Sequence, residues 1–496
     1  MSLAKIYLFQ ILMLKFSIFF LFFFILICLT LFYFSKIHQH QIITKNLSSI
    51  EQLRSFSLFS VITSFFSFLI FAFTYFVYAV KINYSHVFNV SKFMPRTGIL
   101  YFNESLDTFG IIIIFLAYIS GILSFLALDT RIFWKNIRYN LYLSIFILIV
   151  YFFVFSDNLL VLFLFYELLL IPSFLLVYFM APSRRAVQAS LYFVIWTQVG
   201  SFFVLCATSY ILSVVGSTDF YDISRYNFSG TENFLLYTFL FFGFGFKIPI
   251  WPLHYWLTKT HVEAPTGFSM YLSGFLVKSA LYGFYKMTNV IGGEIGNSWL
   301  TAFVFMGIID ASFKMWSQTD IKKLVAYGTI QEMNIIYLAF CWGDVNSVTG
   351  GLIFCITHCF LSLMMFYLVD CIQRRYNSRS VTELSGILQT TPNLGITILV
   401  MCTLYSGIPG TLKFTSEFYI FSGLFEAAPL SCCVLLFIVN VIGLIGFCKI
   451  WFNIVFGMNI KNLKLIPLDL SFKELYILYI CIFFLIFSCF FTHIIF

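Results

Sequence analysis

Long apolar stretches recur along the whole chain, and each has about the length that crosses a lipid bilayer. A membrane-spanning helix needs about 20 mainly apolar residues, and by this criterion the sequence predicts fourteen of them. Their approximate bounds are 6–34, 57–80, 110–128, 139–156, 159–180, 187–214, 234–255, 265–287, 299–317, 321–341, 348–372, 392–425, 430–456 and 474–496. The pattern therefore predicts an all-α integral membrane protein. We expect the first stretch to be retained as a helix, because it is too long for a signal-peptide core.

Two of the predicted helices are interrupted by proline. The seventh, 234–255, contains the sequence KIPIWP at 247–252, and the twelfth, 392–425, contains GIPG at 407–410. Proline removes a backbone donor and breaks a helix, and in lipid the freed carbonyls need neighbouring helices, water or a polar cavity. Interrupted helices in corresponding places are typical of transporters built from inverted repeats. We therefore expect two inverted five-helix repeats, formed by helices 4–8 and 9–13.

The composition excludes the main classes of soluble protein. Of the 496 residues, 61% are hydrophobic and only 10% are charged, with a mean hydropathy of +0.95. A water-soluble surface needs roughly a quarter or more of its residues charged, so a soluble enzyme, a nucleic-acid-binding protein and a disordered chain are all excluded. The net charge of +8 is scattered over short loops. We therefore expect membrane lipids, and no nucleic acid, around this chain.

The basic residues are distributed asymmetrically between the two sides of the predicted membrane. Eighteen of the 29 lie in or beside the odd-numbered loops, and six lie on the even side, which includes the N-terminus. Basic loops stay on the cytoplasmic or matrix side of a membrane. The asymmetry places the odd-numbered loops on that side and both termini on the opposite side.

Ionisable residues at membrane depth are the candidates for chemistry, because each one costs about 2.5–3.5 kcal/mol to insert and needs a reason to be there. The structural explanation is that an acid forms a hydrogen bond to a neighbouring helix, or that a lysine anchors a helix end at the membrane interface. The functional explanation is a proton pathway. The candidate proton-carrying residues are Glu167, Lys247, Lys278 and Glu417, with His254, His358 and Glu332 in support. Asp310 lies one turn before Lys314, so we expect an i,i+4 ion pair there.

The sequence offers no sign of a redox centre. It contains no Walker loop, no G-x-G-x-x-G after a strand, no haem-attachment motif and no C-x-x-C among its twelve cysteines. Cys355, His358 and Cys359 share one helix face, but no fourth metal ligand is evident, so we expect no metal site. The energy for moving protons must then come from a partner.

A set of ordered motifs resembles the antiporter-like subunits of respiratory complex I over about residues 105–455. The motifs are Lys247-x-Pro249, Pro252-Leu-His254-x-Trp256-Leu257, His261-Val-Glu-Ala-Pro265, Glu167-LLLIP172, Asp320-IKKLVAYG328, His358 with Arg375 and Arg379, and Pro409-G-x-x-x-Phe-x-x-Glu417. The resemblance implies that Glu167 pairs with Lys247, that Lys278 links the two repeats, and that Glu417 is the exit residue. It also implies a divergent N-terminal region (1–104), a proton-translocating core (105–456) and a C-terminal loop and helix (457–496).

The resemblance implies a subunit of a proton-translocating NADH:ubiquinone oxidoreductase with no redox centre of its own. No cofactor is expected on this chain, because NADH, FMN, iron–sulfur clusters and ubiquinone belong to partner subunits. The implied partners are other membrane-arm subunits, especially neighbouring antiporter-like ones. The phenylalanine-rich composition, 68 of 496 residues, is typical of an A+T-rich organelle genome and favours the mitochondrial inner membrane, with the basic loops in the matrix. A subunit of a multi-subunit cation/proton antiporter is the alternative, and a scaffold helix bundle is a third.

Three sites depart from the family pattern, and Asp310 is one of them. Gln331-Glu332 stands where the family usually has Ser-His, and Glu332 is a titratable group of different charge. Lys413 stands where the family is normally neutral, one turn before Glu417. Lys413 and Glu417 are therefore candidates for an ion pair.

Overall fold

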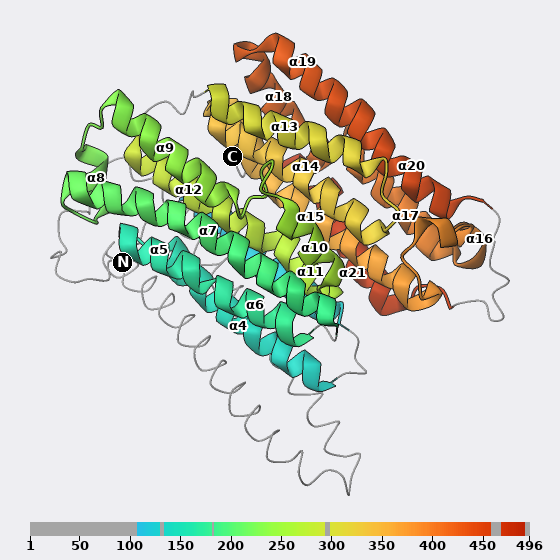
Figure 1. Cartoon of the computed structure of the whole chain (residues 1–496). Coiled ribbons are helices and arrows are strands. Elements are labelled where there is room, and N and C mark those ends of the chain that lie inside the picture. Colours follow the sequence, from blue (N-terminus) through green and yellow to red (C-terminus); the bar gives the residue numbers. More distant parts are fainter. Residues whose placement is uncertain (1–106, 129–132, 181–182, 293–297, 458–467, 492–496) are drawn as a thin grey trace, which may run out of the picture. The chain divides into compact units, whose positions relative to one another are not determined.

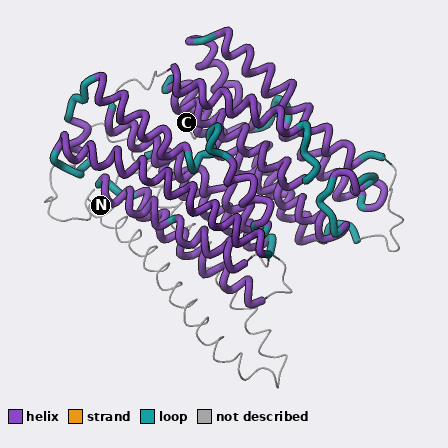
Figure 2. The backbone as a smooth tube through the Cα atoms, viewed as in Figure 1, coloured by secondary structure: helices purple, strands orange, loops and turns teal. Residues whose placement is uncertain are grey.

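The computed structural model describes residues 107–128, 133–180, 183–292, 298–457 and 468–491. Helices joined by short loops make up this part of the chain, as Figures 1 and 2 show. The described residues form no β-strand, and an isolated bridge joins Asp320 to Ser380. The helices predicted at 6–34 and 57–80, and the N-terminal region 1–104, lie outside the described residues.

The helical elements follow one another along the chain as named in Figure 1. They are α3 (Thr108–Leu126), α4 (Phe133–Val154), α5 (Leu159–Leu168), α6 (Leu170–Met180), α7 (Arg184–Val215), α8 (Phe220–Arg225), α9 (Gly230–Gly245), α10 (Tyr255–Glu263), α11 (Thr266–Tyr271), the π-helix η2 (Leu272–Leu276), α12 (Val277–Ile291), α13 (Ser298–Met315), α14 (Ile321–Trp342), α15 (Val345–Tyr376), η3 (Val381–Glu383), α16 (Ile387–Thr390), α17 (Pro392–Tyr405), α18 (Leu412–Ala427), α19 (Pro429–Phe437), the π-helix η4 (Ile438–Gly443), α20 (Leu444–Val455), α21 (Phe472–Phe487) and η5 (Ser488–Phe491).

The helices of the described part match the apolar stretches to within a few residues. Seven of the helices described are long and apolar enough to cross a membrane: Thr108–Leu126, Leu159–Met180, Arg184–Val215, Ile321–Trp342, Val345–Tyr376, Pro429–Val455 and Phe472–Phe490. Shorter apolar helices, such as Pro392–Tyr405, accompany them. By length and composition the chain is a multi-pass membrane protein, while the total of fourteen spans stays a prediction.

Both predicted helix interruptions are present. The first separates α9, which ends at Gly245, from α10, which begins at Tyr255, and the second separates α17 from α18. Side chains bind carbonyl groups at each break. At the first, Trp256 Nε1 donates to Phe246 O at 2.7 Å and Asn334 Nδ2 donates to Pro249 O at 3.2 Å. At the second, Lys413 Nζ donates to Tyr405 O at 2.6 Å. The proline breaks are thus tolerated because neighbouring polar groups replace the lost helix bonds. The inverted relation of the two repeats stays a prediction.

The chain divides into two compact units. The described part of the first contains α4, α5 and α6 as far as Pro172. Asn158 begins α5 by accepting a hydrogen bond from the backbone N–H of Leu160, and α5 packs against α4.

The second unit contains α3 and every described residue from Ser173 onward. Its centre is formed by α14 and α15, whose most apolar stretches are completely buried. α14 lies between α13 and α15, and α15 packs against α18. The approach of α15 to α18 is close enough that a Cβ atom added to Gly350 would stand 2.7 Å from Ile420 N and 2.9 Å from Ser416 O. The polar residues described next therefore lie on helices that are held tightly together.

Candidate functional site

Five ionisable side chains gather at the centre of the second unit, and four different helices supply them. Lys278 comes from α12, Glu332 from α14, His358 from α15, and Lys413 and Glu417 from α18. Their exposed fractions are 0% for Lys278 and His358, 1% for Glu332, 5% for Lys413 and 9% for Glu417. Charges so deeply buried are retained only when they are paired with an opposite charge or serve a function.

Lys278 is the first member of this cluster. The π-helix η2 ends at Leu276, two positions before it, and the Lys278 ammonium donates to the Ser273 carbonyl of that segment. π-Helical turns alter the usual helix bonding and occur frequently at functional sites. The same ammonium also forms a hydrogen bond with His358 Nδ1. Lys278 and His358 are therefore in direct contact, as a proton relay requires.

His358 and Glu332 face each other across a short gap. His358 Nε2 lies 3.9 Å from Glu332 Oε2, which is beyond a normal hydrogen bond. Neither of these two atoms has a hydrogen-bond partner among the described residues. Buried polar atoms without partners are rare and call for an explanation. The other neighbours in the cluster are joined by a hydrogen bond or by an ion pair of 3.6 Å or less.

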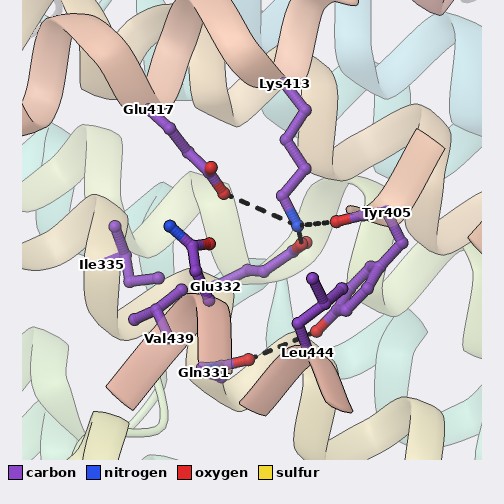
Figure 3. Close-up of a pocket in the computed structure, with 9 residues that line it drawn as sticks. Gln331, Glu332, Ile335, Tyr405, Lys413, Glu417, Val439 and Leu444 are labelled. Atoms are coloured by element: carbon purple, nitrogen blue, oxygen red, sulfur yellow. Dashed lines mark hydrogen bonds and ion pairs between the residues drawn. The ribbon is translucent and has the colours of Figure 1, made fainter. Parts of the chain in front are cut away.

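Lys413 lies between two carboxylates, as Figure 3 shows. Its Nζ is 2.7 Å from Glu332 Oε1 and 3.6 Å from Glu417 Oε1, and it donates to Tyr405 O at 2.6 Å. Tyr405 O is a carbonyl that the second helix interruption frees. The ion pair expected between Lys413 and Glu417 is present, but the shorter contact is with Glu332, a pairing that the sequence did not predict.

A small cavity adjoins this triad. Its volume is about 10 Å³, close to the space that one water molecule needs. Glu332, Lys413 and Glu417 all line it, together with Tyr405 and Gln331. Tyr405 donates to Gln331 Oε1 at 3.2 Å, and Gln331 Nε2 donates to Ser312 Oγ at 2.9 Å. The amide of Gln331 is thus fixed in orientation beside the titratable groups.

His254 belongs to a separate cluster, formed with two residues of α13. Its Nε2 lies 3.3 Å from Asp310 Oδ2 and 3.5 Å from the ammonium of Lys314. The ion pair expected between Asp310 and Lys314 is confirmed, at 2.6 Å. His254 is therefore placed in contact with these two residues, and not with Lys278 or His358.

Glu167 and Lys247 lie in different compact units. Glu167 is partly exposed on α5, in the first unit, and Lys247 is buried in the interruption between α9 and α10, in the second. The pairing between them stays a prediction. Among the described residues, no group of three or more His, Cys, Asp or Glu side chains is arranged to hold a metal ion.

The central cluster has the chemistry of a proton relay. Acidic, imidazole and ammonium groups alternate, and each lies within 4 Å of the next. Short side-chain movements are enough to pass a proton between groups at such distances. The sequence did not predict the ion pair between Glu332 and Lys413. The signal for it was the presence of two opposite charges at membrane depth, since buried charges tend to compensate each other.

Comparisons with known proteins identify the family of the chain. Residues 156–443 match the family described as NADH:quinone oxidoreductase/Mrp antiporter, TM. The NADH-ubiquinone oxidoreductase chain 4 of Paramecium tetraurelia is 46% identical over 398 residues, which is 80% of this chain and 84% of that protein. The chain 4 protein of Acanthamoeba castellanii is 29% identical over 69% of this chain and 70% of its own length.

The fold is also that of a solved membrane subunit. A chain of respiratory complex I from Thermus thermophilus superimposes with a TM-score of 0.72 at 20% identity, covering 88% of this chain and 93% of that one. The motif around Lys247 and the acid at position 417 favour subunit 4 among the antiporter-like subunits. The chain therefore belongs to the NADH:quinone oxidoreductase/Mrp antiporter transmembrane family, in the group whose members are named NADH-ubiquinone oxidoreductase chain 4.

Proposed function

We propose that this chain is a proton-translocating membrane-arm subunit of NADH:ubiquinone oxidoreductase. The observation that carries the proposal is the buried row of ionisable groups from Lys278 through His358 and Glu332 to Lys413 and Glu417. A structural bundle has no use for such a row, and its desolvation is costly. The 46% identity to a chain 4 protein supports the assignment to this enzyme.

The proposed pathway uses the core at residues 105–456. Glu167 and Lys247 form the entry pair, Lys278 links the two halves, and Glu417 is the exit group. His358 and Glu332 connect Lys278 to Glu417. His254 supports the pathway through its contact with Asp310, beside the helix interruption that carries Lys247.

The remaining expectations concern the surroundings of the chain. We place it in the mitochondrial inner membrane, with the basic odd-numbered loops in the matrix and both termini on the other side. Its partners are other membrane-arm subunits, including neighbouring antiporter-like subunits. NADH, FMN, iron–sulfur clusters and ubiquinone bind to partner subunits, and quinone reduction there supplies the energy.

A subunit of a cation/proton antiporter is the second candidate. The fold supports it, because a chain of the Mrp complex from Dietzia sp. DQ12-45-1b superimposes with a TM-score of 0.69. A native gel of gently solubilised membranes separates the two candidates. We expect mass spectrometry to find this chain in a large band that stains for NADH oxidation. Its presence only in a smaller particle without that activity would contradict the proposal and would make sodium-dependent proton exchange the next assay.

A further inference from the structure

Lys413 is the lysine of the central cluster that lies between two carboxylates. Its ammonium contacts two carboxylates from different helices, Glu332 on α14 and Glu417 on α18. A cation that served only to neutralise one acid would need one partner. We propose that Lys413 is a proton-carrying residue, which accepts a proton from Glu332 and delivers it to Glu417. The inference rests on the proposed function and adds a residue to it.

The geometry allows this transfer with little movement. Lys413 Nζ is already at hydrogen-bonding distance from Glu332, at 2.7 Å, and 3.6 Å from Glu417. The flexible lysine side chain can swing to close the gap to Glu417. The Tyr405 carbonyl, 2.6 Å from Nζ, and the Tyr405 ring, whose centroid is 3.8 Å from Nζ, hold the ammonium nearby. Figure 3 shows the ammonium between the two acids. The adjoining cavity, about 10 Å³, leaves room for such a shift or for one water.

Each step conserves protons. The Lys278 ammonium gives a proton to His358 Nδ1, and the resulting imidazolium gives its Nε2 proton to Glu332 across the 3.9 Å gap. Lys413 gives one of its protons to the Glu417 carboxylate and takes the proton that Glu332 has gained. Glu332 is then a carboxylate again, Lys413 an ammonium, and Glu417 a neutral acid. Glu417 releases the proton to water, and Lys278 is protonated again from the entry side. The His358 ring then flips, so that its N–H again faces Glu332 and its free nitrogen faces Lys278.

The competing explanation is that Glu332 and Lys413 only neutralise each other. Arginine separates the two explanations, because a guanidinium keeps the positive charge and pairs with carboxylates but does not release a proton. If charge alone matters, Lys413→Arg supports normal pumping. If Lys413 carries the proton, the variant assembles and oxidises NADH, while NADH-driven proton uptake falls. Removing a positioned proton-transfer group slows its step by about 10²–10⁴-fold.

The test uses the complete complex reconstituted into vesicles, with assembly checked on native gels. Lys449→Arg is the matched control, because Lys449 is an exposed lysine of α20 that lies over the Trp316 ring and outside the cluster. We expect the control to pump as the wild type does. A second variant, Glu332→Gln with Lys413→Met, removes both charges together, and such replacements of buried ion pairs are often tolerated in folding. We expect this double variant to assemble without pumping normally.

Several outcomes would overturn the inference. Normal proton uptake by the assembled Lys413→Arg complex, or by the assembled double variant, would make the pair structural. Failure of both variants to assemble would have the same meaning. These results differ from a failure of the proposed function, in which the wild-type chain would be absent from the NADH-oxidising complex or the wild-type vesicles would take up no protons.

Discussion

At the scale of single residues, burial of charge in this chain is compensated locally. Lys413 has three polar contacts for one ammonium, and Lys322 donates to Ala264 O at 2.6 Å. One exception is the gap between His358 and Glu332, where both facing atoms lack a hydrogen-bond partner in the described part of the chain. A buried polar atom without a partner costs about 1–3 kcal/mol, so the gap marks a place where a proton is expected to pass.

Residue types and spacing could predict part of this site. Lys278, His358 and Glu417 were identified because a charged or imidazole side chain interrupts an apolar stretch. The pair Glu332–Lys413 could not be predicted in the same way, because 81 positions separate the two residues and only the packing of α14 near α18 brings them together. The pair Asp310–Lys314 was predictable, since helix geometry alone places i and i+4 side by side.

The first prediction at this scale concerns the proposed entry pair. Glu167→Gln and Lys247→Ala should each impair NADH-driven proton uptake while the amount of chain in the membrane stays near that of the wild type. Each change removes one titratable group, and the assembled complex then lacks a partner for the first transfer. Proton uptake by reconstituted vesicles measures the effect. Glu426→Gln, an exposed acid of α18, is the control. Normal uptake by either entry variant would remove that residue from the pathway.

At the scale of helices, the apolar stretches predict the elements well because their length is set by the bilayer. The two proline interruptions were predictable for the same reason, since proline breaks a helix in any surroundings. The π-helices η2 and η4 were not predicted, because hydropathy does not distinguish a π-turn from an α-turn. Both lie beside the site: η2 offers the Ser273 carbonyl to Lys278, and η4 contributes Val439 to the cavity wall.

Close helix packing gives a prediction at this scale. Gly350→Ala should push α15 away from α18, because the added Cβ would meet the backbone at Ile420 and Ser416. Overpacking of this kind costs about 1–3 kcal/mol. We expect a lower midpoint for thermal loss of the assembled complex and weaker proton pumping. Gly351→Ala is the matched control, because its Cβ meets only side chains, at 3.2 Å or more. Equal midpoints for both variants would contradict the packing argument.

At the scale of the whole molecule, the function depends on connections between distant parts of the sequence. Arg375 at the end of α15 binds Glu474 of α21 through Nη2 at 2.6 Å and Nη1 at 3.2 Å. Asp469 accepts hydrogen bonds from the backbone of Asn393 and Leu394, at the start of α17. These contacts attach the C-terminal segment to α15, which carries His358, and to α17. Composition and charge asymmetry predicted a membrane protein of this class, but they carry no information on such contacts.

Whether the buried row of residues carries protons is tested by the Lys278→Met variant. The quantity to measure is the number of protons that the reconstituted complex takes up per NADH oxidised. Lys278 is completely buried and joins the His358 side chain to η2, so methionine fills its space without carrying a proton. We expect an assembled complex whose ratio of protons to NADH falls clearly below that of the wild type and of Lys449→Met. A ratio equal to that of the wild type, with normal assembly, would contradict the claim that this row of residues carries protons.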